Sequence, residues 1–399
     1  MSTAEQTRSL PLHDPSWWAG DFWDDLAWLR AHDPVHRVQT PAGPFWALAR
    51  HADVLAVSRD PETWRSGHGV LIDDLRRTVA GNESVIYLDP PEHARQRTLV
   101  SRWFRPRTVA AFEERVRERA RALLDEVPLG DVIDANEALA IPLPIRVIAD
   151  MLGVPESDQA SFREWSDRVI EAGSSQQVTD ETAAGLLELY RYFGDQLDRR
   201  RREPGDDLVT ELVQAEDADG LSRADALAFC MTLLVAGNET TRNLLANGLI
   251  ALAEHPDQWE RLRSEPALVA PAVEELLRWV TPVLHFSRTA TSSTAIGGQR
   301  VEAGEMVVML YASANRDEDV FGPTATALDL GREPNHHVAF GFGEHFCLGA
   351  QLARLEARIF LVELIARVER IEVAGDVVRK RSNLMRGLDA LPMQLHPAT

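Results

Sequence analysis

Cysteine is scarce in this chain: among 399 residues there are only two, Cys230 and Cys347. Two cysteines cannot form a disulfide framework, and a zinc site needs about four ligands, so neither a disulfide framework nor a zinc site is expected. The hydrophobic content of 45% is ample for a large core without them. Free cysteines in a chain of this size favour a reducing compartment, so we predict a cytoplasmic protein.

Long apolar runs and excess positive charge are also absent. No stretch reaches the ~20 apolar residues of a membrane span, and the first twenty residues lack the apolar segment of a signal peptide, so no membrane anchor is expected. The net charge of −20 argues against non-specific nucleic-acid binding, which requires a basic field. Repeats, low-complexity tracts and Gly/Ser linkers are missing too, while the length of 399 residues by itself suggests two or three domains.

One stretch departs from the acidic average. Five arginines crowd residues 95–107, and Arg354 and Arg358 follow Cys347. Two interpretations stay open: solvated helix faces, or a local basic patch for an acidic partner. The second requires the two stretches to lie together in space.

The hydrophobic periodicity predicts a mainly α protein of the α+β type. Apolar residues recur at three- and four-residue spacing from about residue 89 onward, as expected for helices. Two short strands about the turn at 41–44 predict a β-rich part at about 30–60, and alternation returns at 294–310 and at the C-terminus. Because no βαβ alternation occurs, a doubly wound fold is not expected.

The longest predicted helix covers residues 223–254 and is apolar nearly all round at its centre, which is typical of a buried helix. Inside it lies the sequence AGNETT, which brings Glu239, Thr240 and Thr241 to a place where water is scarce. Buried polar groups cost stability unless they are paired. The segment is therefore either a locally capped polar kink or a functional site.

Cys347 lies in the glycine-rich sequence FGFGEHFCLG, directly before a strongly periodic helical segment. Cys230 fits the role of a small apolar core residue, but Cys347 is expected at a helix N-terminus, where backbone N–H groups favour a thiolate. Such a thiolate can act as a nucleophile or as a metal ligand. His345 is the only base near it in sequence.

The pattern F-G-x-G-x-H-x-C-x-G at 340–349 resembles the haem-thiolate loop of the cytochrome P450 superfamily. Three more motifs occur in the order of that family: HARQR with His93 and Arg97, AGNETT, and EELLR with Glu275 and Arg278. Together they cover about residues 89–354. The chain is therefore identified as a member of the superfamily, of the bacterial, actinobacterial type. The resemblance implies the cytochrome P450 fold in a single domain over residues 1–399.

The resemblance implies that haem b lies between the long helix and the cysteine loop. It implies Cys347 as the iron ligand, with Phe340 packed near it, and Glu239 and Thr240 as the groups that deliver protons during oxygen activation. The remaining cofactor-binding residues that it implies are His93, Arg97, Arg288 and His345 at the propionates, Ala236 and Gly237 above the iron, and Gly341 and Gly349 in the loop.

The resemblance also implies an apolar substrate pocket, formed by segments 67–82 and 162–192 and by Val235, Val283, Leu284, Phe286, Leu384 and Met385. We expect hydroxylation of a sterol, terpenoid, branched lipid or polyketide; desaturation and oxidative coupling stay open. Dioxygen is the co-substrate. Because the chain has no flavin or iron–sulfur segment, electrons are expected from a ferredoxin with its reductase.

One position departs from the family pattern. An arginine that usually completes the network of the Glu275–Arg278 pair is replaced by Ala327 or Thr326. Either Arg332 substitutes for it, or the network is thinner and holds haem more loosely. Two rival functions remain: a haem-binding sensor or carrier, and a hydrolase with Cys347 as nucleophile.

Overall fold

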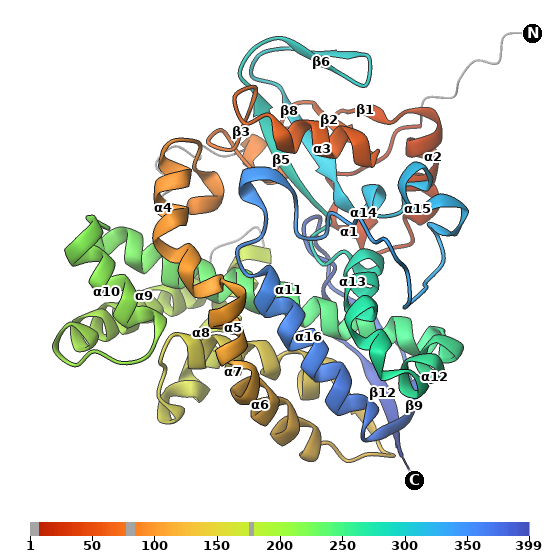
Figure 1. Cartoon of the computed structure of the whole chain (residues 1–399). Helices are drawn as coiled ribbons and strands as arrows, with labels where there is room; N and C mark the ends of the chain where they lie inside the picture. The colour runs from red at the N-terminus through yellow and green to blue at the C-terminus, as the bar shows by residue number, and fades with distance from the viewer. Residues whose placement is uncertain (1–7, 77–83, 175–178, 399) are drawn as a thin grey trace, which may run out of the picture.

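The computed structural model describes residues 8–76, 84–174 and 179–398. Strands and short helices of the N-terminal part, together with strands from residues 285–310, form the top of the molecule in Figure 1, and long helices form most of the rest. The α-helices are α1 (Pro15–Trp18), α2 (Trp23–His32), α3 (His51–Arg59), α4 (Glu92–Ser101), α5 (Pro106–Ala111), α6 (Glu113–Asp125), α7 (Pro142–Met151), α8 (Gln159–Ser174), α9 (Asp180–Arg202), α10 (Leu208–Asp219), α11 (Arg223–Glu254), α12 (Pro256–Ser264), α13 (Val269–Val280), α14 (Tyr311–Ala314), α15 (Glu318–Phe321) and α16 (Ala350–Ile365).

The strands form small sheets. The largest has the order β1-β2-β8-β5-β3, and a three-stranded sheet has the order β4-β12-β9. The strands are β1 (Val35–Val38), β2 (Phe45–Leu48), β3 (Trp64–Arg65), β4 (Val132–Asp134), β5 (His285–Ala290), β6 (Thr294–Ile296), β7 (Gln299–Val301), β8 (Met306–Leu310), β9 (Val368–Val373), β10 (Val378–Arg379), β11 (Leu388–Ala390) and β12 (Pro392–Pro397). The prediction of a mainly helical protein with small sheets is confirmed.

Alternation along β8 explains why the five-stranded sheet is buried on both faces. Met306, Val308 and Leu310 pack into a core with the N-terminal helices α1 and α2. Val307 and Met309 point the other way, into a second core with α3. Successive side chains of a strand alternate between faces, so a wholly apolar strand requires cover on both sides.

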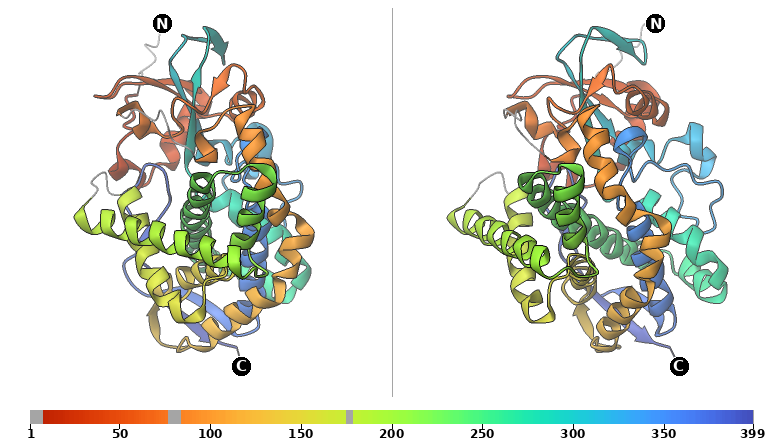
Figure 2. Two further views of the ribbon diagram at one scale, coloured as in Figure 1. Left: turned by 90° about the vertical axis from the view of Figure 1, so that its left-hand side faces the viewer. Right: turned by 60° about the vertical axis from the view of Figure 1, so that its left-hand side comes forward.

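Helix α11 is the central element of the helical part. It begins with a capping box, in which the Ser222 side chain and Asp225 satisfy each other's backbone N–H groups. Its 32 residues match the predicted range, and α8, α9 and α10 lie over it as an outer layer (Figure 2). Although α11 is apolar, no helix among the described residues is apolar over a length that would cross a membrane.

Candidate functional site

The loop before α16 is held in a tight conformation by two glycines. Gly341 and Gly343 have φ values of +69° and +73°, which side chains other than glycine rarely tolerate. A Cβ on Gly343 would also clash with the carbonyl of Ser58, at the end of α3. The backbone N–H of Cys347 donates to the carbonyl of Phe340 at 2.9 Å, which closes the loop. This geometry places Cys347 three residues before α16.

Cys347 combines an exposed residue surface with dense surroundings. The residue is exposed, yet enough protein surrounds it that burial raises the pKa of its thiol; the Gly349 backbone N–H and the charges of Arg97 and Arg354 act in the opposite direction. A Cβ on Gly349 would also meet nothing within 4 Å.

Four basic side chains from separate elements converge beside this loop: His93 and Arg97 of α4, Arg288 of β5, and His345 itself. The rings of His93 and His345 lie 4.1 Å apart. Arg97 donates to the carbonyl of Phe346 at 2.5 Å, and Arg288 donates to the carbonyl of Ser287 at 2.6 Å. The structure thus brings together all four residues for which the sequence predicted a common role.

Arg97 and Arg288 create a positive field at this cluster, with few anions nearby. Within the described part of the chain, no carboxylate forms an ion pair with Arg97 or Arg288. Burial, followed by the two arginine charges, lowers the pKa of His93 to about 4; burial followed by Arg288 lowers that of His345 to about 2. Planar guanidinium groups match carboxylates. The donor set therefore suits the two propionate groups of haem.

A metal cation suits the same cluster less well. Ligand atoms of His93, Glu344 and His345 lie within 4.8 Å of one another, a spacing that a metal ion could bridge. However, the charges of Arg97 and Arg288 act on both histidines and lower their pKa values. The same charges would repel a cation, so the cluster favours an anionic ligand.

The middle of α11 carries the predicted acid and alcohol side chains. Ala236 is exposed although it lies in the central helix, and Thr240 donates its hydroxyl to the Ala236 carbonyl at 2.7 Å. Glu239 is 6% exposed and lies 3.9 Å from Arg242. Burial raises the pKa of Glu239, and the charge of Arg242 counteracts this. Glu239 is therefore a buried carboxyl group whose protonated form is more favoured than that of an exposed one.

Gly237 has a packing explanation in this structure. A Cβ at this position would lie 2.7 Å from Cδ1 of Ile148, on α7. This contact is sufficient to require glycine where α7 crosses α11. By contrast, Ala236 is exposed next to it.

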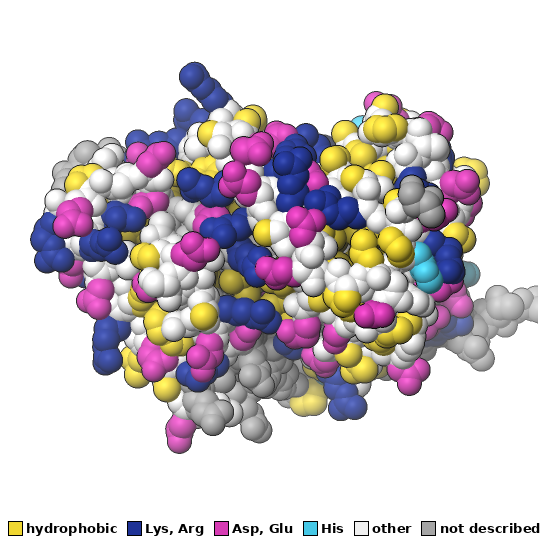
Figure 3. Space-filling view, turned by 90° about the horizontal axis from the view of Figure 1, so that it is seen from below, with side chains coloured by type: hydrophobic (Ala, Val, Ile, Leu, Met, Phe, Trp, Pro, Cys, Tyr) yellow, Lys and Arg dark blue, Asp and Glu magenta, His cyan; other side chains and the backbone are white. Residues whose placement is uncertain are grey.

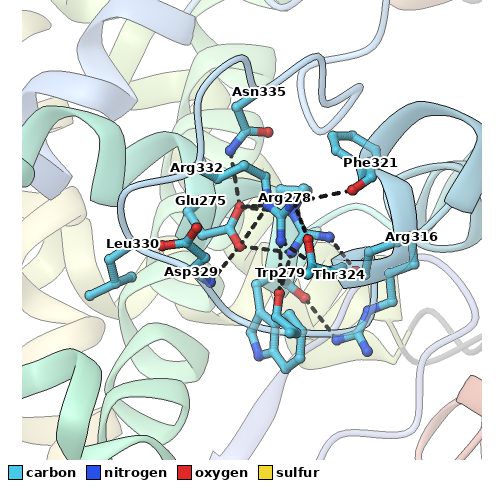
Figure 4. A network of polar contacts seen from close by, with 12 residues as sticks. Glu275, Arg278, Trp279, Arg316, Phe321, Thr324, Asp329, Leu330, Arg332 and Asn335 are labelled. Atoms are coloured by element: carbon cyan, nitrogen blue, oxygen red, sulfur yellow. Dashed lines mark hydrogen bonds and ion pairs between the residues drawn. The ribbon is translucent and has the colours of Figure 1, made fainter.

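Glu275 and Arg278 lie at the centre of a buried network on α13 (Figure 4). Arg278 donates to both carboxylate oxygens of Glu275, at 2.8 and 2.7 Å. Arg332 donates to the same two oxygens at 3.1 and 3.2 Å, and Asn335 adds a bond of 3.0 Å. Arg332 therefore supplies the arginine that the sequence pattern lacked, and the thinner network considered from sequence is not observed.

Introducing an arginine at Ala327 is expected to leave the rate of haem loss unchanged. The Ala327 carbonyl already accepts bonds from Arg278 and Arg332, and Ala327 itself is exposed. A new side chain at 327 would point into solvent and find the Glu275 oxygens occupied. Transfer of haem to an acceptor globin measures the rate in Ala327→Arg and in the unmodified chain. A markedly slower loss in the variant would contradict this account.

The predicted pocket residues from two distant segments meet. The Leu284 N–H donates to the Leu384 carbonyl at 2.8 Å, and Val283 forms a β-bridge with Met385. Phe286 lies against the edge of Tyr311, and Val235 is partly exposed on α11. The predicted segments 67–82 and 162–192 extend into 77–83 and 175–178, which lie outside the described residues.

Leu284 is an exception among these residues. It is 1% exposed and packs into the core with the N-terminal helices, together with Leu310 and Ala312. Its side chain thus packs in the core beneath the sheet, and a role of Leu284 in the pocket stays a prediction.

The two arginine-rich stretches do lie together, but they are not an open basic patch. One surface groove of about 260 Å³, lined by residues of α5, α6, α13 and α16, includes Pro106 of the first stretch and Arg354 and Arg358 of the second. Arg354 pairs with Glu274 and Arg358 with Glu113, while Arg102 pairs with Glu211 and Arg95 with Glu92. Seen from below, side chains of both signs are likewise interspersed over the surface (Figure 3). For these four arginines, the ion pairs favour the interpretation as solvated helix faces.

Sequence reasoning missed several residues around the site. Ser66 contacts Nε2 of His345 at 3.1 Å, and Arg242 lies against Glu239. Asn335 and His337 hold the chain that leads into the cysteine loop. Only Asn335 and His337 could have been suspected of a role in the site, because they closely precede the cysteine loop in the sequence.

Comparison with known proteins places this geometry in a family. The model of the family described as Cytochrome P450 matches residues 174–388. A vitamin D(3) 25-hydroxylase of Pseudonocardia autotrophica is 38% identical over 403 aligned residues, 98% of each chain. A nocardicin C N-oxygenase of Nocardia uniformis is 41% identical and covers 98% of this chain and 99% of its own.

Solved structures agree with the sequence matches. Cytochrome P450 CYP268A2 of Mycobacterium marinum, in complex with pseudoionone, superposes with a TM-score of 0.87 at 37% identity and covers 99% of this chain and 100% of its own. Fold, cysteine loop and relatives agree. The chain belongs to the cytochrome P450 family, a haem-thiolate family that uses dioxygen and redox partners, and it is a P450 monooxygenase.

Proposed function

We propose that this P450 inserts one oxygen atom of dioxygen into an apolar small molecule, with haem b bound through Cys347 and with electrons from a ferredoxin. The observation that carries the proposal is the convergence of His93, Arg97, Arg288 and His345 beside Cys347, an exposed residue. The two unpaired cysteines support a cytoplasmic location, which stays a prediction.

Residues of this chain are suited to the iron of haem, to its propionates and to a small ligand on α11. Cys347 would ligate the iron, and Phe340 is held next to it by the backbone bond to Cys347. The four basic residues would hold the propionates through charge-assisted hydrogen bonds. When bound, haem with a thiolate ligand supplies the activation of dioxygen. The internal surface at Ala236 leaves room for a small ligand on α11.

Glu239 and Thr240 would control protons at this surface. The Thr240 hydroxyl donates to the Ala236 carbonyl, which leaves its oxygen free to accept a hydrogen bond. Glu239 is buried next to Arg242, and the two opposing influences on its pKa allow it to take up and release a proton. Buried carboxyl groups with such tuned pKa values are suited to general acid catalysis.

Glu239→Gln is expected to lower product formation by about 10²-fold, because the amide cannot release a proton as a general acid. Haem content and substrate affinity should stay close to those of the unmodified chain, since Glu239 is neither among the residues proposed to hold haem nor among those proposed to line the pocket. Turnover and peroxide release measure the effect. The matched control is Glu254→Gln at the end of the same helix, which should retain activity; equal activity in both variants would contradict the role of Glu239.

The substrate class is proposed from the pocket residues and from the relatives. Val235, Val283, Phe286, Leu384 and Met385 are apolar, which favours an apolar or amphipathic ligand. The relatives include a hydroxylase named for vitamin D(3) and a structure with bound pseudoionone. We therefore propose hydroxylation of a sterol, terpenoid, branched lipid or polyketide.

Turnover under isotopically labelled dioxygen tests the proposed function. Sterols, terpenoids and fatty acids are first titrated into the holoprotein, and those that shift the haem spin state are used as substrates. Mass spectrometry of the product should then show one labelled oxygen atom. A product oxidised without label would point to desaturation or coupling. Haem binding without turnover of any ligand would favour a carrier or sensor.

Reduction by ferredoxin is expected to depend on Arg105 and Arg107. Both are exposed, and over the described ranges neither has an ion-pair partner, so they can meet an acidic surface. Changing both to Glu should slow reduction about tenfold at low ionic strength, and high salt should remove the difference. Arg381→Glu, at an exposed position in the C-terminal segment, is the control. The same slowing in the control, or none at low salt, would contradict this docking surface.

A further inference from the structure

We propose that Glu274 is a positioning residue for the Cys347 loop: it clamps the chain before the cysteine to α13 and α16. This inference rests on the proposed role of Cys347 as a haem ligand. Glu274 is the neighbour of Glu275 but belongs to a different set of contacts, and its side chain lies at the surface groove between α5, α13 and α16.

Glu274 joins three separate parts of the chain. Arg354 of α16 donates to it from Nε at 2.6 Å and from Nη2 at 2.8 Å, in a two-point contact. His337, in the segment before the cysteine loop, lies with Nε2 at 3.0 Å from Oε2. Two-point arginine–carboxylate contacts fix orientation as well as distance.

The hydrogen bonds of His337 determine its tautomer. The backbone N–H of Ala339 donates to Nδ1 at 3.2 Å, so this nitrogen accepts. In the neutral ring, Nε2 then carries the hydrogen and donates it to Glu274. The ring is thereby fixed at both nitrogens, and it holds the backbone at Ala339, next to Phe340, against α13.

Phe340 connects this clamp to the cysteine. The guanidinium carbon of Arg354 lies 4.6 Å from the centre of the Phe340 ring, and the His337 ring lies 6.0 Å from it. The Phe340 carbonyl accepts the Cys347 N–H at 2.9 Å. Both partners of Glu274 therefore pack on the residue that closes the cysteine loop.

The carboxyl group of Glu274 is ionised near neutral pH. Burial alone would raise the pKa of this carboxyl group, but hydrogen bonds from His337 and Arg354 outweigh burial and lower the pKa to about 2. Replacing Glu274 with glutamine therefore removes a negative charge while the size and shape of the side chain stay nearly the same. Glu274→Gln keeps an acceptor for His337 but places an amide against the Arg354 guanidinium.

The chain offers a matched control in the same groove. Glu113 accepts from Arg358, one helical turn beyond Arg354, at 2.8 Å, and from Arg117 at 2.8 Å. Its side chain is 35% exposed, compared with 29% for Glu274. Glu113 has no hydrogen bond to the cysteine loop within the described ranges, so Glu113→Gln removes a similar ion pair without the clamp.

The test compares the holoproteins of Glu274→Gln, Glu113→Gln and the unmodified chain. Amide hydrogen exchange of the peptide containing residues 340–347 should be about tenfold faster in Glu274→Gln and unchanged in Glu113→Gln, because a charge-assisted contact is lost in the first only. The thiolate-type spectrum of the reduced carbon monoxide complex should also decay faster in Glu274→Gln. Glu274→Asp should restore part of both properties.

Equal exchange and equal spectral decay in the two Gln variants would overturn the proposal. If Glu274→Gln does not retain haem, His337→Gln is measured in the same way, since it leaves the Arg354–Glu274 pair in place; unchanged exchange there would also overturn the proposal. If the unmodified chain shows no thiolate-type spectrum, the proposed function fails, while hydrogen exchange still reports on the clamp.

Discussion

Cys347→Ser is expected to give a folded protein without monooxygenase turnover above background. The loop conformation depends on Gly341, Gly343 and the backbone bond from residue 347 to Phe340, none of which needs the sulfur. A serine hydroxyl is not ionised near neutral pH and does not replace a thiolate as a soft, electron-donating ligand. Product formation with any accepted substrate, together with circular dichroism of the variant, measures this outcome.

Cys230→Ala is the control for this experiment. Cys230 is fully buried on α11, and burial raises the pKa of its thiol to about 12, so it is an apolar core residue. Its replacement should cost a small amount of stability and leave turnover intact. Turnover retained in Cys347→Ser, or lost equally in Cys230→Ala, would contradict the assignment of Cys347.

Glu275→Gln is expected to lower the free energy of unfolding by about 3–5 kcal/mol, the usual cost of breaking a buried ion pair. Glu275 is fully buried and receives bonds from Arg278, Arg332, Asn335 and the backbone N–H of Asp329. An amide would leave two buried guanidinium groups without a counter-charge. This is a large fraction of the total stability of about 5–15 kcal/mol that proteins possess.

Urea unfolding followed by circular dichroism, and the yield of folded protein, measure the effect of Glu275→Gln. Glu302→Gln serves as the control, since Glu302 pairs with Arg300 at an exposed position and its loss should leave unfolding unchanged. A Glu275→Gln protein as stable as the control would mean that the buried network does not hold α13 to the loop before the cysteine.

The elements that the sequence predicted well are those with a strong local pattern. Helix α11 covers the predicted range because its apolar residues recur without interruption and Ser222 marks its start. The strands β1 and β2 pair about the predicted turn at 41–44. The cysteine loop was recognisable because each of its glycines and the histidine occupies a fixed place in one short stretch.

The long-range contacts were not predictable in the same way. Arg332 reaches Glu275 across 57 positions, and Arg354 reaches Glu274 across 80. No local periodicity reports which carboxylate pairs with an exposed arginine, so the sequence left both interpretations of the arginine-rich stretch open.

The absorption spectrum of the purified protein, reduced and exposed to carbon monoxide, tests the central claim most directly. The account predicts bound haem and the strongly red-shifted Soret band of a thiolate-ligated carbonyl complex, which Cys230→Ala should retain and Cys347→Ser should lose. A protein without haem, or a band at the position of histidine-ligated haem in the unmodified chain, would contradict the assignment of Cys347 as the iron ligand.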